Sequence, residues 1–198
     1  MRPRHGHGAA SGRKNFLITV SVYAMLNIGN TDGAIERVTA LNKEIRERSI
    51  AMIENLGRVL QTYNFSRVFF HVPLWKHYYH TLYWFDFHFA GPEQFLGAEF
   101  HVPGLEDIDR PADIHVTEKQ IEAYYDAVAA KSRRYLELLT DEMLAEPAEG
   151  IYSRLDLILG QFRHVYGHLG NINAITIQDT GKWPRMETRP GEESELYE

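Results

Sequence analysis

Four segments of this chain repeat apolar residues every three or four positions, which is the spacing of one face of a helix. They cover residues 31–60, 73–89, 117–138 and 153–178. No strand-like alternation of apolar and polar residues is sustained after residue 30. Four amphipathic segments in a chain of 198 residues therefore predict an all-α fold, a four-helix bundle whose apolar faces share one core.

Residues that start and stop helices lie at the ends of these segments. Pro73 suits a first helical turn, and the pair Gly91-Pro92 ends the same segment. Thr117, followed three residues later by Gln120, predicts a capping box at the start of the third helix. The polar connection over residues 97–116 is long for a compact domain, and such connections often form the wall of a site.

The two ends of the chain differ from the bundle. We expect an atypical N-terminal extension, partly disordered, over residues 1–30, the bundle over 31–183 and an acidic C-terminal tail over 184–198. The extension has a basic start and an apolar stretch, 16–26, as a signal peptide does, but no small-x-small cleavage site follows. The stretch is also shorter than the roughly 20 apolar residues of a membrane span. We therefore expect a cytoplasmic protein with no membrane partner.

Composition excludes several kinds of chemistry. The chain has no cysteine, so disulfides, a cysteine nucleophile and thiolate metal ligands are absent. Any metal site must use nitrogen and oxygen ligands, and ten histidines can supply them. The net charge is −6, from 27 acidic and 21 basic residues, and the basic run is confined to residues 2–14. Because phosphate binding depends on clustered Lys and Arg, we expect no nucleic-acid partner.

Histidines spaced four apart predict a metal site. His164 and His168 lie one turn apart on one helical face, so both imidazoles can reach one ion. Two histidines at the edge of a core can also simply bond to carbonyl groups or to each other. The segment 73–89 offers a third histidine at His77 or at His80, one turn apart. Three histidines would leave an open position on the ion, which is the arrangement of catalytic zinc.

Several known motifs are missing. Val165 stands where a zinc protease of the His-Glu-x-x-His type needs its glutamate. A di-iron bundle needs two Glu-x-x-His pairs, but His77, Gln161 and Val165 stand three residues before His80, His164 and His168. No P-loop, Gly-x-Gly-x-x-Gly or Gly-x-Ser-x-Gly motif occurs.

Two stretches resemble the DinB-like superfamily. Residues 79–87 read Tyr-His-Thr-Leu-Tyr-Trp-Phe-Asp-Phe and are similar to its second-helix signature. Residues 163–172 read Arg-His-Val-Tyr-Gly-His-Leu-Gly-Asn-Ile and resemble its C-terminal His-x-x-x-His-x-Gly-Gln-Ile motif, with Asn171 in place of the usual glutamine. The resemblance covers residues 25–183.

This resemblance implies a four-helix bundle with a divalent ion on a histidine triad, which matching positions assign to His80, His164 and His168. We expect zinc first, with nickel or iron as alternatives. Relatives include thiol-dependent S-transferases and a maleylpyruvate isomerase, so the resemblance implies a small-molecule substrate and a low-molecular-weight thiol. A homodimer is an open expectation. The alternatives are a non-catalytic, stress-related metal binder and a hydrolase that activates water.

Other polar and aromatic residues of the second helix receive provisional roles. His77 is the competing ligand, with a neighbouring contact to the site or a surface position as its other role. We expect Trp84 and His88 in a pocket wall or in the core, and tyrosines such as Tyr79 in packing roles with a polar tip. Asp86 is expected to be solvated rather than bonded near the site.

Overall fold

The computed structural model describes residues 31–111, 113–191 and 195–197. It contains helices α1 (Thr31–Thr62), α2 (Leu74–His88), α3 (Glu118–Leu138), α4 (Asp141–Ala145) and α5 (Arg154–Thr180), and the short 3-10 helix Pro92–Gln94. Four of these helices are long and pack together, so the prediction of an all-α bundle is confirmed. The predicted N-terminal extension lies outside the described residues.

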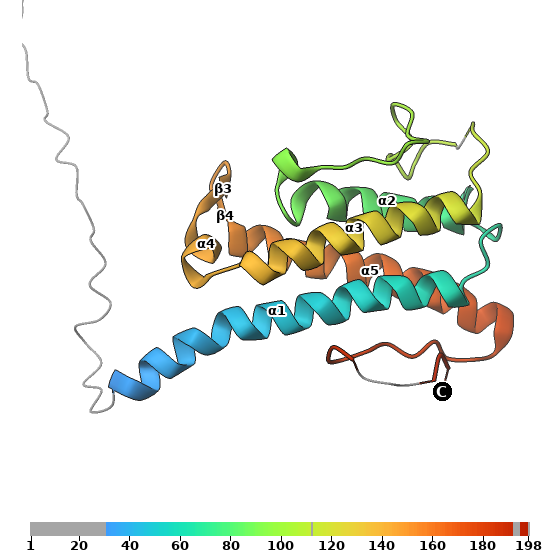
Figure 1. Cartoon of the computed structure of the whole chain (residues 1–198). Coiled ribbons are helices and arrows are strands. Elements are labelled where there is room, and N and C mark those ends of the chain that lie inside the picture. Colours follow the sequence, from blue (N-terminus) through green and yellow to red (C-terminus); the bar gives the residue numbers. More distant parts are fainter. Residues whose placement is uncertain (1–30, 112, 192–194, 198) are drawn as a thin grey trace, which may run out of the picture.

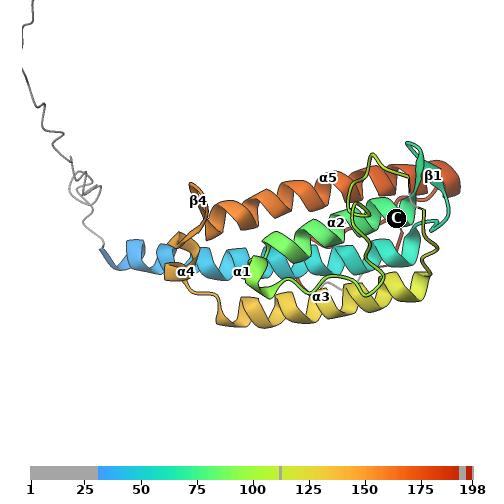
Figure 2. The same ribbon diagram turned by 90° about the horizontal axis from the view of Figure 1, so that it is seen from above.

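The four long helices lie side by side around one core (Figures 1 and 2). Helix α2 packs along α5 and α3, and α1 packs along α5 and α3. Each long helix places fully buried apolar side chains in the core, among them Met52, Leu82, Ile121 and Val165. Burying such side chains is the main favourable term in folding a bundle of this size.

Capping residues fix where two of the helices begin. The hydroxyl of Thr117 accepts a hydrogen bond from the amide of Gln120, whose side chain bonds back, so the predicted capping box is confirmed. Ser153 and Asp156 form the same reciprocal arrangement at the start of α5. Each box satisfies amide groups that the first turn of a helix leaves unpaired.

Two short hairpins precede the two helices that carry the clustered histidines. Strands β1 (Val68–Phe69) and β2 (Val72–Pro73) pair just before α2. Strands β3 (Pro147–Glu149) and β4 (Tyr152–Ser153) pair just before α5. Each hairpin therefore leads the chain directly into a helix of the candidate site.

The connection between α2 and α3 runs alongside α2 (Figure 1). The carboxylate of Asp86 accepts hydrogen bonds from the amides of Leu96, at 3.2 Å, and Gly97, at 3.0 Å. Lys76, at the other end of α2, donates to the carbonyl of Arg110. Asp86 is fully buried, so the expectation that it is solvated was wrong.

The described part of the C-terminal tail lies against α1 (Figure 1). Asn55 bonds to both backbone groups of Glu187, and Arg58 pairs with the Glu187 carboxylate at 2.6 Å. The amide of Arg185 donates to the carbonyl of Leu196, which closes the tail into a loop. The domain boundary at residue 184 stays a prediction. Among the described residues, no helix is long and apolar enough to cross a membrane.

Candidate metal centre

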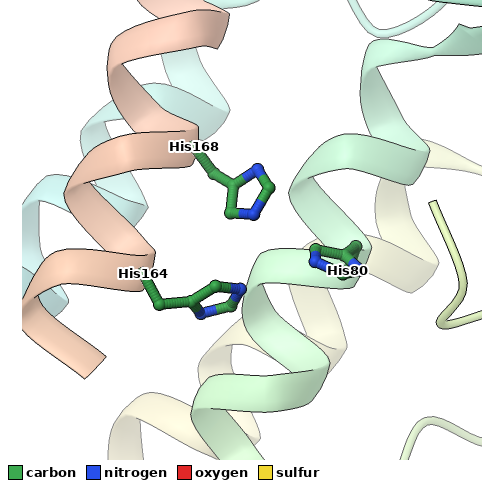
Figure 3. Close-up of side chains that lie close together, drawn as sticks. All are labelled: His80, His164 and His168. Atoms are coloured by element: carbon green, nitrogen blue, oxygen red, sulfur yellow. The ribbon is translucent and has the colours of Figure 1, made fainter. Parts of the chain in front are cut away.

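Three histidines from two helices converge on one point (Figure 3). His80 comes from α2, and His164 and His168 come from α5. One ring nitrogen of each lies within 4.8 Å of the others, which is a spacing that one ion can bridge. The ring centroids are 4.8 Å apart for His80–His168 and His164–His168, and 5.5 Å for His80–His164.

The packing of α2 against α5 brings the triad together. His164 and His168 lie four residues apart, so their side chains leave α5 on the same face. Val165 and Leu169, which directly follow them, are fully buried and fix the rotation of α5 about its axis. This rotation leaves both imidazoles at the edge of the core, facing α2 (Figure 3).

The ring of His80 is oriented by the connection between α2 and α3. Its Nδ1 lies 2.6 Å from the carbonyl oxygen of Glu106. Because a carbonyl oxygen only accepts, Nδ1 must carry the proton, and Nε2 keeps its lone pair for an ion. A metal-ligating histidine usually donates the N–H of its other ring nitrogen to a carbonyl or carboxylate in this way. Residues 97–116 were expected to form a wall of the site, and their contact with the triad is the Glu106 carbonyl.

His164 carries an unpaired buried nitrogen. Its Nδ1 lies 3.3 Å from Oε1 of Gln161, one turn earlier on α5. Its Nε2 is buried and has no hydrogen-bond partner within the part of the chain that the structure describes. Leaving such an atom unsatisfied costs about 1–3 kcal/mol. A metal ion on Nε2 would remove that cost, so the residues present fit a metal ion.

Burial keeps the three imidazoles neutral. Desolvation lowers the pKa of His164 to about 3, with further lowering by the neighbouring His168 and His80. Desolvation also lowers the pKa of His168 to about 4, again with a contribution from His80. The pKa of His80 is lowered by desolvation as well. Neutral imidazole is the form that binds metals, so at neutral pH the triad is ready to ligate.

His77, the competing residue on α2, is engaged elsewhere. Its Nε2 lies 2.9 Å from the carbonyl oxygen of Phe69 in β1, and its ring packs 5.3 Å from the Phe69 ring. It is buried and does not belong to the cluster of ligand nitrogens. The geometry therefore favours His80 over His77, and the ligand assignment itself stays a prediction.

A cavity of about 980 Å³ opens beside the triad, with His80 and His164 in its wall. Trp84 and His88 also line it, as expected for a pocket wall. Their rings stack with centroids 5.6 Å apart and planes 18° apart. His88 Nδ1 lies 3.5 Å from a carboxylate oxygen of Glu149, on the β3–β4 hairpin. An ion and this His–Glu pair would therefore face one cavity.

Sequence reasoning missed three contributors to this site. Gln161 and Glu149 carried no motif that distinguished them from ordinary surface residues. Glu106 acts through its backbone carbonyl, and no side-chain pattern signals such a role. Only the length of the connection over residues 97–116 drew attention to the segment that contains Glu106.

Comparisons with models of known protein families, with curated proteins and with solved structures give no match to this chain. The resemblance to the DinB-like superfamily therefore rests on the two motifs quoted above. The protein is mostly helical and holds a cluster of three histidines that could bind a metal ion.

Proposed function

We propose that this protein binds one divalent metal ion through His80, His164 and His168, and that it is a DinB-like enzyme acting on small molecules. The observation that carries the proposal is the convergence of three ring nitrogens within 4.8 Å, beside a cavity whose wall includes His80 and His164. The unpaired Nε2 of His164 supports it, because an ion would give that atom its partner.

The ligand set limits the choice of metal. Nitrogen ligands from three imidazoles suit zinc, and nickel or iron are the alternatives. Three protein ligands leave at least one position for a substrate or solvent, as catalytic zinc sites do. Bound there, the ion would lower the pKa of a nucleophile and polarise an electrophile.

The reaction that we favour is thiol transfer or isomerisation with a low-molecular-weight thiol. The chain has no cysteine, so a nucleophilic sulfur must come from a cofactor. Trp84 offers an aromatic surface for the apolar part of a substrate. His88, beside Glu149, can accept or return a proton in the same cavity.

Two other functions have specific support. A hydrolase that activates water needs a base but no thiol, and the His88–Glu149 pair could be that base. A non-catalytic metal binder needs only the triad. The open cavity of about 980 Å³ favours an enzyme over the binder, because a purely structural site is closed by its ligands.

The test is elemental analysis combined with a thiol-consumption assay on electrophilic small molecules. Protein purified without chelators should contain about one divalent ion per chain, and His164→Ala should contain almost none, since two ligands seldom retain an ion. Consumption of added thiol should require metal and fail in His164→Ala. Metal-free wild-type protein would refute the metal site. Metal-dependent turnover without thiol would replace the transferase by the hydrolase.

We extend the proposal to the partners. Net charge of −6 leaves little counterion release to drive binding to nucleic acid, so duplex DNA should bind weakly. The metal cavity is lined within one chain, which allows either a monomer or a homodimer. Sedimentation of the purified protein distinguishes the two.

A further inference from the structure

A continuous set of contacts joins the connection between α2 and α3 to the metal triad. It passes from Tyr79 on α2 to His101, then to Glu106 and finally to His80, the residue after Tyr79. The connection therefore contacts two consecutive residues of α2 through two of its own residues. None of the other triad members has a partner from this connection among the described residues.

The first contact fixes His101. The hydroxyl of Tyr79 lies 2.6 Å from His101 Nδ1, and Tyr79 is fully buried. The other ring nitrogen, Nε2, faces a carboxylate oxygen of Glu106, which only accepts, so Nε2 carries the ring proton and Nδ1 accepts a hydrogen bond from the Tyr79 hydroxyl. The ring of Tyr83 stacks on His101, with centroids 5.2 Å apart and planes 27° apart. His101 is thus held by a hydrogen bond in its plane and by an aromatic face.

The second contact places Glu106. His101 Nε2 lies 3.9 Å from Oε2 of Glu106, so the ring N–H faces this carboxylate. That Oε2 is buried and makes no hydrogen bond within the described residues, and the His101 N–H is the ion-pair partner that faces it. The backbone carbonyl of Glu106 accepts a hydrogen bond from His80 Nδ1 at 2.6 Å.

We propose that His101 is a positioning residue of the metal site. Held by Tyr79, it keeps Glu106 in place, and the Glu106 carbonyl then keeps the His80 proton on Nδ1 and its free nitrogen toward the triad. This inference rests on the proposed metal binding and adds a determinant of affinity that lies outside the ligands. Because linkage is reciprocal, metal binding should in turn strengthen the attachment of the connection to α2.

Zinc affinity, measured by competition with a chelator, tests the proposal. Tyr79→Phe removes one hydroxyl and His101→Leu removes the polar ring. Each should raise the zinc Kd by about 10-fold or more, as other changes behind a ligating histidine do. His101→Gln can place an amide N–H near the position of Nε2, which keeps a donor facing Glu106, and should stay within about threefold of wild type. The matched control is His115→Leu, which changes an exposed histidine of the same connection and should leave the Kd unchanged.

A metal-free readout separates this inference from the proposed function. Nitrogen-15 spectra of the imidazole rings report which nitrogen of His80 carries the proton. Wild-type protein should show His80 protonated on Nδ1, whereas Tyr79→Phe and His101→Leu should show a mixture of the two tautomers, because the carbonyl that selects one is displaced. This result is expected even if no ion binds. An unchanged His80 tautomer in both variants, or an unchanged zinc Kd in both, would overturn the role of His101.

Discussion

His77 and His80 lie one turn apart on α2, and the direction of each ring decides which of them can reach an ion. His80→Ala removes a nitrogen from the cluster, so it should abolish stoichiometric zinc binding. His77→Ala breaks a hydrogen bond to Phe69 instead, and its zinc Kd should rise by less than about 10-fold. Titration with a chelator measures both. If His77→Ala loses the ion and His80→Ala keeps it, the ligand from α2 is His77 and not His80.

The lowered pKa values of the triad predict how the metal-free protein responds to acid. The usual histidine pKa is 6.5, whereas that of His164 falls to about 3 and that of His168 to about 4. Between these values and 6.5 the unfolded chain binds protons that the folded chain does not. Stability is therefore fully present above pH 6.5 and falls as the pH drops toward 4.

Urea unfolding of the metal-free protein at several pH values measures this effect. The unfolding midpoint should fall between pH 7 and pH 4, and His164→Gln should fall less steeply, because glutamine does not titrate. The exposed His115, replaced in the same way, is the matched control and should leave the slope unchanged. A wild-type midpoint that is flat over this range would contradict the neutral state of the triad.

His88 should matter for turnover and not for metal content. It lines the cavity but is not part of the nitrogen cluster, so His88→Gln should retain the ion. If it transfers a proton, kcat should fall by about 100-fold, within the usual range for a general base or acid. Glu149→Gln should give a smaller loss of kcat, since the Glu149 carboxylate lies 3.5 Å from His88 Nδ1 and affects turnover only through that ring. Equal kcat in wild type and His88→Gln would show that His88 lines the cavity but does not transfer a proton.

The residues of the site differ in how visible they are from sequence. The spacing of His164 and His168 and the two motifs were enough to name the clustered histidines. Asp86 was misjudged because its charged partner, Lys131, lies 45 residues away on α3, and sequence patterns report only near neighbours. The carbonyl of Glu106 could not be predicted at all, since every residue has one.

At the level of elements, the four long helices could be predicted to within two residues at each end, whereas the short helix α4 was missed. Capping residues such as Thr117 and Ser153 mark these ends locally, which is why they are readable. The hairpins were missed because strands of two or three residues are too short to show alternation.

The pair formed by Asp86 and Lys131 joins α2 to α3, and we expect it to be a major determinant of stability. Asp86 is fully buried, and it also bonds to the hydroxyl of Tyr124 at 2.8 Å. Asp86→Asn would leave the buried Lys131 ammonium without its counter-charge, which typically costs about 3–5 kcal/mol. Urea unfolding measures the loss.

A second substitution, at Lys131, tests whether the unpaired charge causes the loss of stability in Asp86→Asn. In the double variant Asp86→Asn/Lys131→Met neither of the two positions carries a charge, so part of the lost stability should return. The exposed pair Lys43 and Glu47 on α1 serves as the control, and Lys43→Met should change stability by less than about 0.5 kcal/mol. Additive losses in the double variant would show that the two side chains act independently.

At the scale of the whole molecule, the site and the tail lie on different sides of the bundle. The triad sits between α2 and α5, whereas the described tail residues contact α1 and, through Met186, the side of α5 at Asn173. Asn55 is a buried link, because its side chain is fully buried and bonds to the Glu187 carbonyl at 2.8 Å and to the Glu187 amide at 2.6 Å. Sequence gave no sign of this contact, since the acidic, Gly- and Pro-containing tail has the composition of a mobile segment.

We therefore predict that Asn55→Ala destabilises the protein without emptying the metal site. The substitution removes two buried hydrogen bonds between Asn55 and Glu187, so the free energy of unfolding in urea should fall by about 1–3 kcal/mol. In a chain that ends at Lys182 the same substitution should cost much less, because its partner is gone. Metal content should equal that of wild type in all three proteins, since none of the changed residues touches the triad. An equal cost of Asn55→Ala with and without the tail would show that Asn55 stabilises the helices, for example through its bond to Tyr166, and not the attachment of the tail.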